Sequence, residues 1–152
     1  MKTIASFTVN HDKLKRGMYI SRIDGDVTTY DIRMREPNKG DYLSNPALHS
    51  FEHLFATYAR NSALTDNVIY VGPMGCRTGF YFLTRGLSHR EAIDLVTDCF
   101  KKIAAHEGAI PGATRIECGN YLEQDLEGAK NEASAMLGVL SGITEADLIY
   151  EK

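Results

Sequence analysis

The sequence predicts an α+β domain in which an antiparallel sheet packs against helices. Short segments with alternating apolar and polar residues occur in pairs around turn residues, as in antiparallel hairpins. Three longer segments instead carry apolar residues at the spacing of one helix face. The two kinds of segment do not alternate regularly, which argues against a parallel α/β fold. A chain of 152 residues is long enough for one hydrophobic core, so we expect a single domain over residues 1–152.

Composition narrows the functional classes. Hydrophobic residues make up 43% of the chain and charged residues 24%, and the net charge is −3, so neither nucleic acid nor an anionic membrane is an expected partner. No apolar run approaches the roughly 20 residues of a membrane-spanning helix. Residues 1–15 lack the apolar stretch of a secretion signal. Three cysteines cannot all pair, which argues against a disulfide framework and for a reducing cytoplasm.

The first expected elements are a hairpin and a helix. Residues 18–23 and 27–34 alternate around Asp24-Gly25-Asp26, a turn sequence typical of a two-stranded hairpin. Residues 37–40 break the chain, and a helix capped by Ser44 or Asn45 follows, with Pro46 in its first turn and Arg60 near its end. At about 100° per residue, this helix has two different faces. One face is apolar (Ala47, Phe51, Leu54, Phe55, Tyr58), and the opposite face carries His49, Glu52, His53, Ala56 and Arg60.

A second pair of strands and a second helix come next. Residues 67–71 and 78–84 are the expected strands, joined by a glycine-rich bend that ends at Cys76. Ser88 and Glu91 form a capping box for a helix that runs to about Glu107. Cys99 falls on the apolar face of this helix, as a small core residue would.

The last third of the chain predicts one extended piece and one more helix. Residues 115–118 are expected to be extended and to end at Gly119. Asp125 can cap a helix that Ser141-Gly142 ends, and Thr144 can start a last short one. The expected core face of the longer helix is Leu126, Ala129, Ala133, Met136, Leu137 and Leu140.

The pair His49 and His53 is the main functional feature. A spacing of four residues places two imidazoles one above the other on a helix, close enough to share a metal ion. A bare pair of histidines is more typical of a solvated helix face than of a metal site, but Glu52 and a suitable third ligand reverse that preference here. Cys118, beside Gly119, is the natural third ligand, because backbone can approach closely there. Two imidazoles and one thiolate leave an open coordination position, as expected of a catalytic metal site.

Several separated motifs resemble one known family. These motifs are HSFEH at residues 49–53, GPMGC followed by RTGFY at residues 72–81, and ECGNY at residues 117–121 followed by DLEGAK at residues 125–130. Their combination resembles S-ribosylhomocysteine lyase, the LuxS family. The agreement begins at Ser6-Phe7 with His11, includes residues 30–33 and 37–39, and reaches Lys130.

The resemblance implies an α+β homodimer with active sites at the subunit interface. It implies that His49, His53 and Cys118 bind the metal, natively Fe²⁺ with Zn²⁺ or Co²⁺ as possible substitutes. By the same resemblance, Glu52 and Cys76 are the acid–base pair, and the residues that hold the substrate are Ser6, His11, Arg33 and Arg60. Tyr70 departs from the family pattern, because many members carry an aspartate there that helps hold the homocysteine end.

The implied reaction cleaves a thioether without net redox chemistry. Proton transfers move the carbonyl of opened S-ribosylhomocysteine along the ribose, and β-elimination then releases homocysteine and 4,5-dihydroxy-2,3-pentanedione, the autoinducer-2 precursor. A thiolate at Cys76 suits these transfers, and a nearby cation such as Arg33 could help keep it ionised.

Two other functions compete with the lyase. HxxEH is also the inverted zinc-peptidase motif, although such enzymes commonly use a carboxylate as third ligand and do not need a thiol like Cys76. A metal-binding or redox-sensing module without catalysis would tolerate loss of Glu52, whereas a lyase would not.

Overall fold

Four strands form one antiparallel sheet in the order β1-β2-β4-β3. In the computed structural model, which describes residues 1–152, the strands are β1 (Gly17–Asp24), β2 (Val27–Arg33), β3 (Val68–Pro73) and β4 (Gly79–Arg85). The α-helices are α1 (Asn45–Arg60), α2 (His89–Ala104) and α3 (Leu126–Leu140). Three short 3-10 helices complete the chain: η1 (Ala5–Phe7), η2 (Thr65–Asn67) and η3 (Glu145–Leu148). The predicted α+β class is confirmed.

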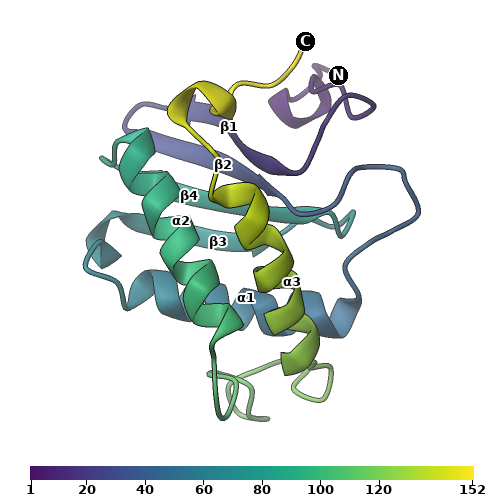
Figure 1. The fold of residues 1–152 in the computed structure, drawn as a ribbon, viewed down its shortest axis with the longest axis vertical. Coiled ribbons are helices and arrows are strands. Elements are labelled where there is room, and N and C mark those ends of the chain that lie inside the picture. The colour runs from purple at the N-terminus through teal and green to yellow at the C-terminus, as the bar shows by residue number, and fades with distance from the viewer.

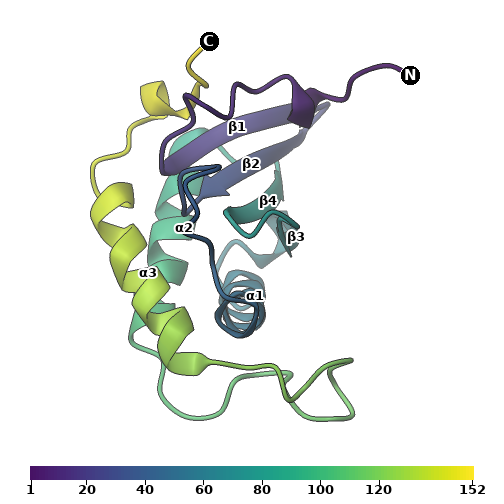
Figure 2. The same cartoon turned by 90° about the vertical axis from the view of Figure 1, so that its right-hand side faces the viewer.

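The helices lie on one side of the sheet. Figure 1 shows α2 and α3 side by side in front of the strands, with α1 crossing behind their lower parts, near β3. In the perpendicular view of Figure 2, no α-helix covers the opposite face of the sheet, and both termini lie at the β1 end. The long connection from α2 to α3 passes beneath α1. The sheet therefore has one face packed on the core and one face without helices.

The first hairpin is built as predicted. Its two strands pair down to Asp24 and Val27, so that only Gly25 and Asp26 form the turn. Gly25 has φ +62° and Asp26 is not in the left-handed region, the pattern of a type II′ turn with glycine at its first central position. The turn twists in the same sense as the strands, and the pairing continues from it to Arg22 before a register shift between Arg22 and Ile20.

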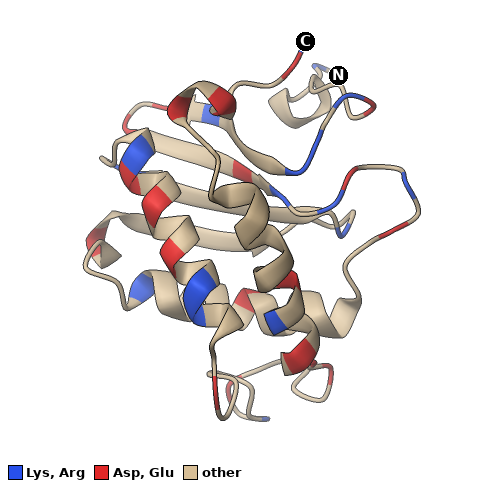
Figure 3. Cartoon of the chain, in the orientation of Figure 1, with Lys and Arg blue, Asp and Glu red and all other residues tan.

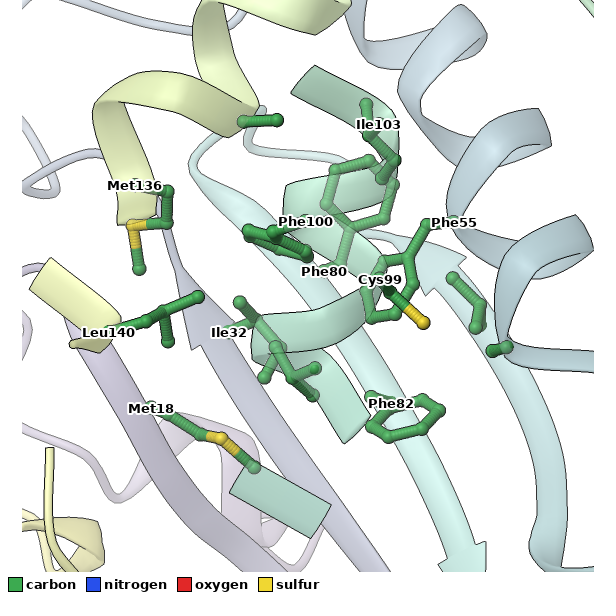
Figure 4. Packing of buried hydrophobic residues seen from close by; sticks show 14 of the residues in the cluster. Met18, Ile32, Phe55, Phe80, Phe82, Cys99, Phe100, Ile103, Met136 and Leu140 are labelled. Carbon is green, nitrogen blue, oxygen red and sulfur yellow. The ribbon is translucent and has the colours of Figure 1, made fainter. Parts of the chain in front are cut away.

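The core lies between the sheet and the helices. Phe51 and Phe55 of α1 pack against Phe80 of β4 and Phe100 of α2, with ring centroids 4.9–6.2 Å apart. Figure 4 shows the rings of Phe55, Phe80 and Phe100 among apolar side chains from β1, β2 and α3. Cys99 lies in the same cluster and is 1% exposed, so its predicted core position is confirmed. Burial raises the pKa of its thiol to about 12, which keeps the group neutral.

The predicted helix starts are confirmed. Ser44 caps α1 by accepting from the Ala47 N–H, and Ser88 and Glu91 form the capping box of α2. Asp125 accepts from the N–H of Gly128 at the start of α3, at 2.9 Å. The apolar face predicted for α3 is only partly buried, with Leu126 and Leu137 at its edge and the other four residues in the core.

Two predictions about the segment after α2 were wrong. The helix ends at Ala104 rather than near Glu107, ahead of Gly108, which has φ +89°. Residues 115–118 are not extended but form consecutive turns, because the N–H groups of Glu117 and Cys118 both donate to the Thr114 carbonyl. The backbone N–H groups of this segment bond locally because no strand of the sheet pairs with residues 115–118.

Charge is distributed without a large patch of one sign. Figure 3 shows basic and acidic residues interspersed along the helices and loops. On α2 they form two pairs at i and i+4, Arg90 with Asp94 and Asp98 with Lys102. None of the helices combines the length and the apolar character that crossing a bilayer requires.

Candidate active site

His49, His53 and Cys118 meet at one point. The first two are presented by α1, and the third comes from the connection between α2 and α3. The Nε2 atoms of the two imidazoles are 3.1 Å apart, and the Cys118 Sγ lies 3.4 Å from His49 Nε2 and 3.9 Å from His53 Nε2. A tetrahedral ion with bonds of about 2.0 Å to nitrogen and 2.3 Å to sulfur would separate such donors by roughly 3.3–3.6 Å. The three donor atoms therefore have the spacing of a shared metal site.

The protonation of the two rings supports this assignment. His49 Nδ1 lies 2.7 Å from the Glu123 carbonyl oxygen, and His53 Nδ1 lies 2.9 Å from that of Pro111. A carbonyl oxygen can only accept, so each Nδ1 carries a proton and each ring turns its Nε2 toward the other. The backbone N–H of Asn120 donates to the Cys118 sulfur at 3.4 Å. Two imidazole nitrogens and one cysteine sulfur that face one another form a donor set that suits a divalent metal, so these residues fit such an ion.

The connection that carries Cys118, which we call the ligand loop (residues 105–125), is anchored to α1 near its beginning. The Tyr58 hydroxyl and His106 Nδ1 are 2.6 Å apart, and His106 Nε2 lies 3.0 Å from the Ala109 carbonyl. His106 Nε2–H therefore donates to the loop, and Nδ1 accepts from Tyr58. Gly112 comes next in the loop and has φ +70°, a conformation that favours glycine. A Cβ atom at this position would lie only 3.2 Å from His53 Nδ1. The first part of the loop can thus bring the Pro111 carbonyl to His53.

A second anchor holds the end of the ligand loop. Ser50, fully buried beside His49, donates to the Gln124 side-chain oxygen at 2.7 Å and accepts from the Asp125 N–H at 2.8 Å. The same helix therefore supplies two metal-ligand candidates and both anchors of the loop that supplies the third. This arrangement fixes Cys118 relative to the imidazoles without any strand in the loop.

Glu52 lies on the same helix face as the two histidines and is half-buried. Its carboxylate makes no side-chain hydrogen bond or ion pair within the chain. Glu52 is not one of the residues whose ligand atoms converge, but an unengaged carboxylate one position before His53 is a suitable proton-transfer group.

Cys76 lies in the turn between β3 and β4 and is exposed. Its Sγ is 3.0 Å from the Thr78 hydroxyl oxygen, which also accepts from Arg33 Nη1 at 2.6 Å. Because that oxygen already accepts from a cation, its own proton is available for the sulfur. Leu43, just before α1, donates its N–H to the Arg77 carbonyl and so ties this turn to the start of α1.

Arg33 is 3% exposed and is paired within the chain. Its Nη2 donates to Asp31 Oδ2 at 2.7 Å, in a salt bridge that is buried on both sides. Burial alone would lower the pKa of Arg33, but the neighbouring Asp31 carboxylate and the Cys76 thiol together hold that pKa above its ordinary value. The guanidinium therefore stays charged, and it is linked to Cys76 through the Thr78 hydroxyl.

The other candidate substrate residues lie elsewhere. Ser6 and Tyr70 line one hollow of about 430 Å³ on the helix-free face of the sheet, a hollow that none of the metal-ligand candidates lines. His11 is half-buried, with Nδ1 2.9 Å from the Val9 carbonyl. Arg60 is exposed and donates to the Ile69 carbonyl at 2.6 Å, next to Tyr70. Within one chain, therefore, the hollow lined by Ser6 does not include the metal-ligand group.

Sequence comparison identifies the family. A sequence model described as S-Ribosylhomocysteinase (LuxS) matches residues 4–146. The chain belongs to the LuxS family. It is 48% identical to the S-ribosylhomocysteine lyase of Phocaeicola vulgatus, over 99% of this chain and 98% of that protein. It is 45% and 44% identical to the lyases of Clostridium beijerinckii and Borreliella burgdorferi, over 99% of each chain.

Membership in the LuxS family agrees with the resemblance found from the motifs. It gives no support to the peptidase alternative, and the ligand group contains a thiolate where a carboxylate would be expected of that class. Two further histidines, His89 at the start of α2 and His106 in the ligand loop, lie outside the ligand group and bond instead to Tyr30 and Tyr58.

Sequence reasoning missed the residues that support this LuxS site. Thr114 and Glu117 match the S/T-x-x-E capping pattern, a signal that could have predicted the turns before Cys118. No sequence pattern marks Ser50, Tyr58 or Thr78 as a supporting residue. Each forms its hydrogen bond with a residue at least 45 positions away in the chain.

Proposed function

We propose that this protein cleaves S-ribosylhomocysteine to homocysteine and 4,5-dihydroxy-2,3-pentanedione, the autoinducer-2 precursor. The observation that carries the proposal is the convergence of His49, His53 and Cys118 in a chain that matches the LuxS family over residues 4–146. The three residues hold a divalent metal, natively Fe²⁺, and Zn²⁺ or Co²⁺ are substitutes with the same preference for nitrogen and sulfur donors. When bound, the metal supplies Lewis acidity toward carbonyl and hydroxyl oxygens of the substrate.

The chain itself supplies the proton transfers. Glu52 and Cys76 act as the acid–base pair, one removing a proton from a carbon next to the carbonyl and the other returning one to the neighbouring carbon. Repeated transfer moves the carbonyl until it is β to the C–S bond. Removal of a further α-proton then breaks the C–S bond, and the homocysteine sulfur leaves with a proton. The unengaged carboxylate of Glu52 and the exposed thiol of Cys76 support these roles.

Substrate binding falls to Ser6, His11, Arg33 and Arg60 in this proposal. Arg33 acts from within the fold, since both of its terminal nitrogens are engaged by Asp31 and Thr78. Tyr70, 53% exposed beside Ser6, offers an aromatic wall instead of a carboxylate at the amino-acid end of the substrate.

We further propose that all 152 residues form one catalytic domain that works as a homodimer with shared sites. Two features support sharing: the hollow lined by Ser6 does not include the metal-ligand group of its own chain, and large apolar side chains are exposed at and beside the helix-free face of the sheet. These side chains are Tyr70 of β3, Ile4 in the same hollow, and Phe7 of η1. The three free thiols suit a reducing cytoplasm.

The test of the reaction is direct. Purified, metal-loaded protein incubated with S-ribosylhomocysteine should release one free thiol per substrate, and peptides should remain uncut. Peptide cleavage without thiol release would point to the peptidase and overturn the proposal.

The test of site sharing uses two inactive chains. Equal amounts of His11→Ala and Glu52→Ala chains should recover about a quarter of the wild-type activity, because half of the dimers are mixed and each has one intact site. Full activity in a species that sediments as a monomer would exclude the shared site.

A further inference from the structure

The C-terminal segment reaches the catalytic turn through a chain of buried hydrogen bonds. Tyr150 donates its hydroxyl to Asp31 Oδ2 at 2.7 Å, and the same oxygen accepts from Arg33. Arg33 continues to Thr78, and Thr78 to Cys76. The path therefore links a residue near the C-terminus to the candidate acid–base thiol.

Strand β2 explains why this path is buried. Asp31 and Arg33 are two residues apart, so their side chains lie on the same face of the strand. The alternate residues Tyr30 and Ile32 lie on the opposite face, in the core. No α-helix covers the face that carries the two charges, yet they are only 1% and 3% exposed. Part of the cover is the Tyr150 ring, which stacks on Tyr19 of β1 at a centroid distance of 5.0 Å. The C-terminal segment thus shields a charged pair that would otherwise face solvent.

The balance of charge at Asp31 decides how Arg33 acts. When a carboxylate bonds to one side of a guanidinium, it weakens the attraction of that guanidinium for a second anion on the other side. Asp31 Oδ1 and Arg33 Nε have no hydrogen-bond partner, so the Tyr150 hydroxyl is the one additional donor to the carboxylate. The Tyr150 hydroxyl partly compensates the charge of the Asp31 carboxylate. The positive charge of Arg33 then stabilises negative charge at Thr78 and Cys76 more strongly.

The other groups near Asp31 are few. Burial raises the pKa of Tyr19, and Tyr19 is close enough to Asp31 for that charge to raise it further, but its hydroxyl donates to the Lys15 carbonyl. Asp147 of η3 is a further negative charge near Tyr19. Burial and then the Asp31 charge raise the pKa of the Tyr150 hydroxyl, so it remains a donor at any working pH.

We infer that Tyr150, acting through Asp31 and Arg33, is a positioning residue that favours the thiolate form of Cys76. The inference deepens the proposed function, since it concerns the acid–base thiol, but it can be tested without substrate. Removal of the Tyr150 hydroxyl should draw Arg33 toward Asp31 and make the Cys76 thiolate less stable.

The test is the pH dependence of Cys76 alkylation by iodoacetamide, followed by mass spectrometry of the Cys76 peptide in the metal-loaded protein. Tyr150→Phe keeps the ring stack and removes only the hydroxyl. The pH of half-maximal alkylation should rise by about half a unit or more, so that labelling near neutral pH slows roughly threefold. Tyr19→Phe is the matched control, because it removes a hydroxyl from the same stack that does not touch Asp31.

The outcomes separate this inference from the proposed function. A profile for Tyr150→Phe that coincides with wild type, or an equal shift in Tyr19→Phe, would overturn the role of Tyr150. A chain that lacks residues 150–152 provides a second variant. Its pH profile of Cys76 alkylation should shift at least as far as that of Tyr150→Phe. Lack of lyase activity in the wild-type protein would overturn the proposed function but leave the alkylation result unchanged.

Discussion

The two halves of the candidate site are held by different kinds of bond. Main-chain carbonyls orient His49 and His53, and a twice-anchored loop delivers Cys118. The Cys76 thiol, by contrast, contacts a side chain, Thr78, and through it the buried Arg33, although backbone hydrogen bonds hold the turn that carries it. Backbone partners cannot be removed by a single substitution, whereas a side-chain path can be cut at each residue. The metal-ligand group should therefore resist remote substitutions better than the thiol does.

The largest effect is expected from loss of the thiolate ligand. Cys118→Ala removes one of three protein donors, so the protein should purify with little metal and without activity. Metal analysis beside a thiol-release assay checks both results. A Cys118→Ala protein that retains full metal would show that the sulfur is not a ligand.

Cys76→Ala should separate the two halves of the site. The thiol is not part of the ligand group, so the metal content should equal that of wild type. The rate of thiol release should fall by about 10²-fold or more, the scale of losing a general acid–base group. The same two measurements apply, and loss of metal from Cys76→Ala with retention in Cys118→Ala would reverse the assignment of roles.

A smaller effect is expected where the ligand loop is anchored by a side chain. Tyr58→Phe removes the hydroxyl that bonds His106, which loosens the loop ahead of the Pro111 carbonyl. Direct partners of metal ligands change metal affinity about 10–100-fold, and Tyr58 acts one step further out, so we expect a loss of up to about tenfold. Competition with a chelator measures it, and the visible spectrum of the Co²⁺-substituted protein should report altered ligand geometry.

Tyr121→Phe provides the control for that experiment. Tyr121 lies in the same loop and its hydroxyl makes no hydrogen bond within the chain, so its loss should leave metal retention unchanged. If the two variants release metal at the same rate, the anchor at Tyr58 does not support the site.

The smallest effect concerns the third cysteine. Cys99 is buried in the core cluster and is not part of the metal-ligand group, so Cys99→Ala should keep metal and activity. Its folded pKa of about 12 lies above the 9.0 of an ordinary thiol, so the stability it contributes is complete below pH 9 and is lost as pH rises toward 12. Over that range wild type should lose up to about 1.4 kcal/mol per pH unit more than Cys99→Ala. Urea unfolding at pH 8 and pH 10 measures the difference, and parallel losses would exclude a buried neutral thiol.

Local sequence determined much of this protein. The hairpin at Gly25, the caps at Ser44, Ser88 and Asp125, and the two faces of α1 each depend on residues within a few positions of one another. The paired imidazoles belong to the same class, since a spacing of four residues on a helix fixes them side by side. These features were predicted correctly because nearby atoms decide them.

Tertiary structure decided the rest. Cys118 reaches His49 across 69 positions of sequence, through a loop whose turns were mistaken for an extended piece, and the loop holds its place because Ser50 and Tyr58 bind it from α1. Asp31 and Arg33 would be expected in solvent on a helix-free sheet face, and they are buried because the chain returns 119 residues later to bring Tyr150 to Asp31. Such contacts depend on the three-dimensional path of the whole chain, which no local pattern of residues encodes.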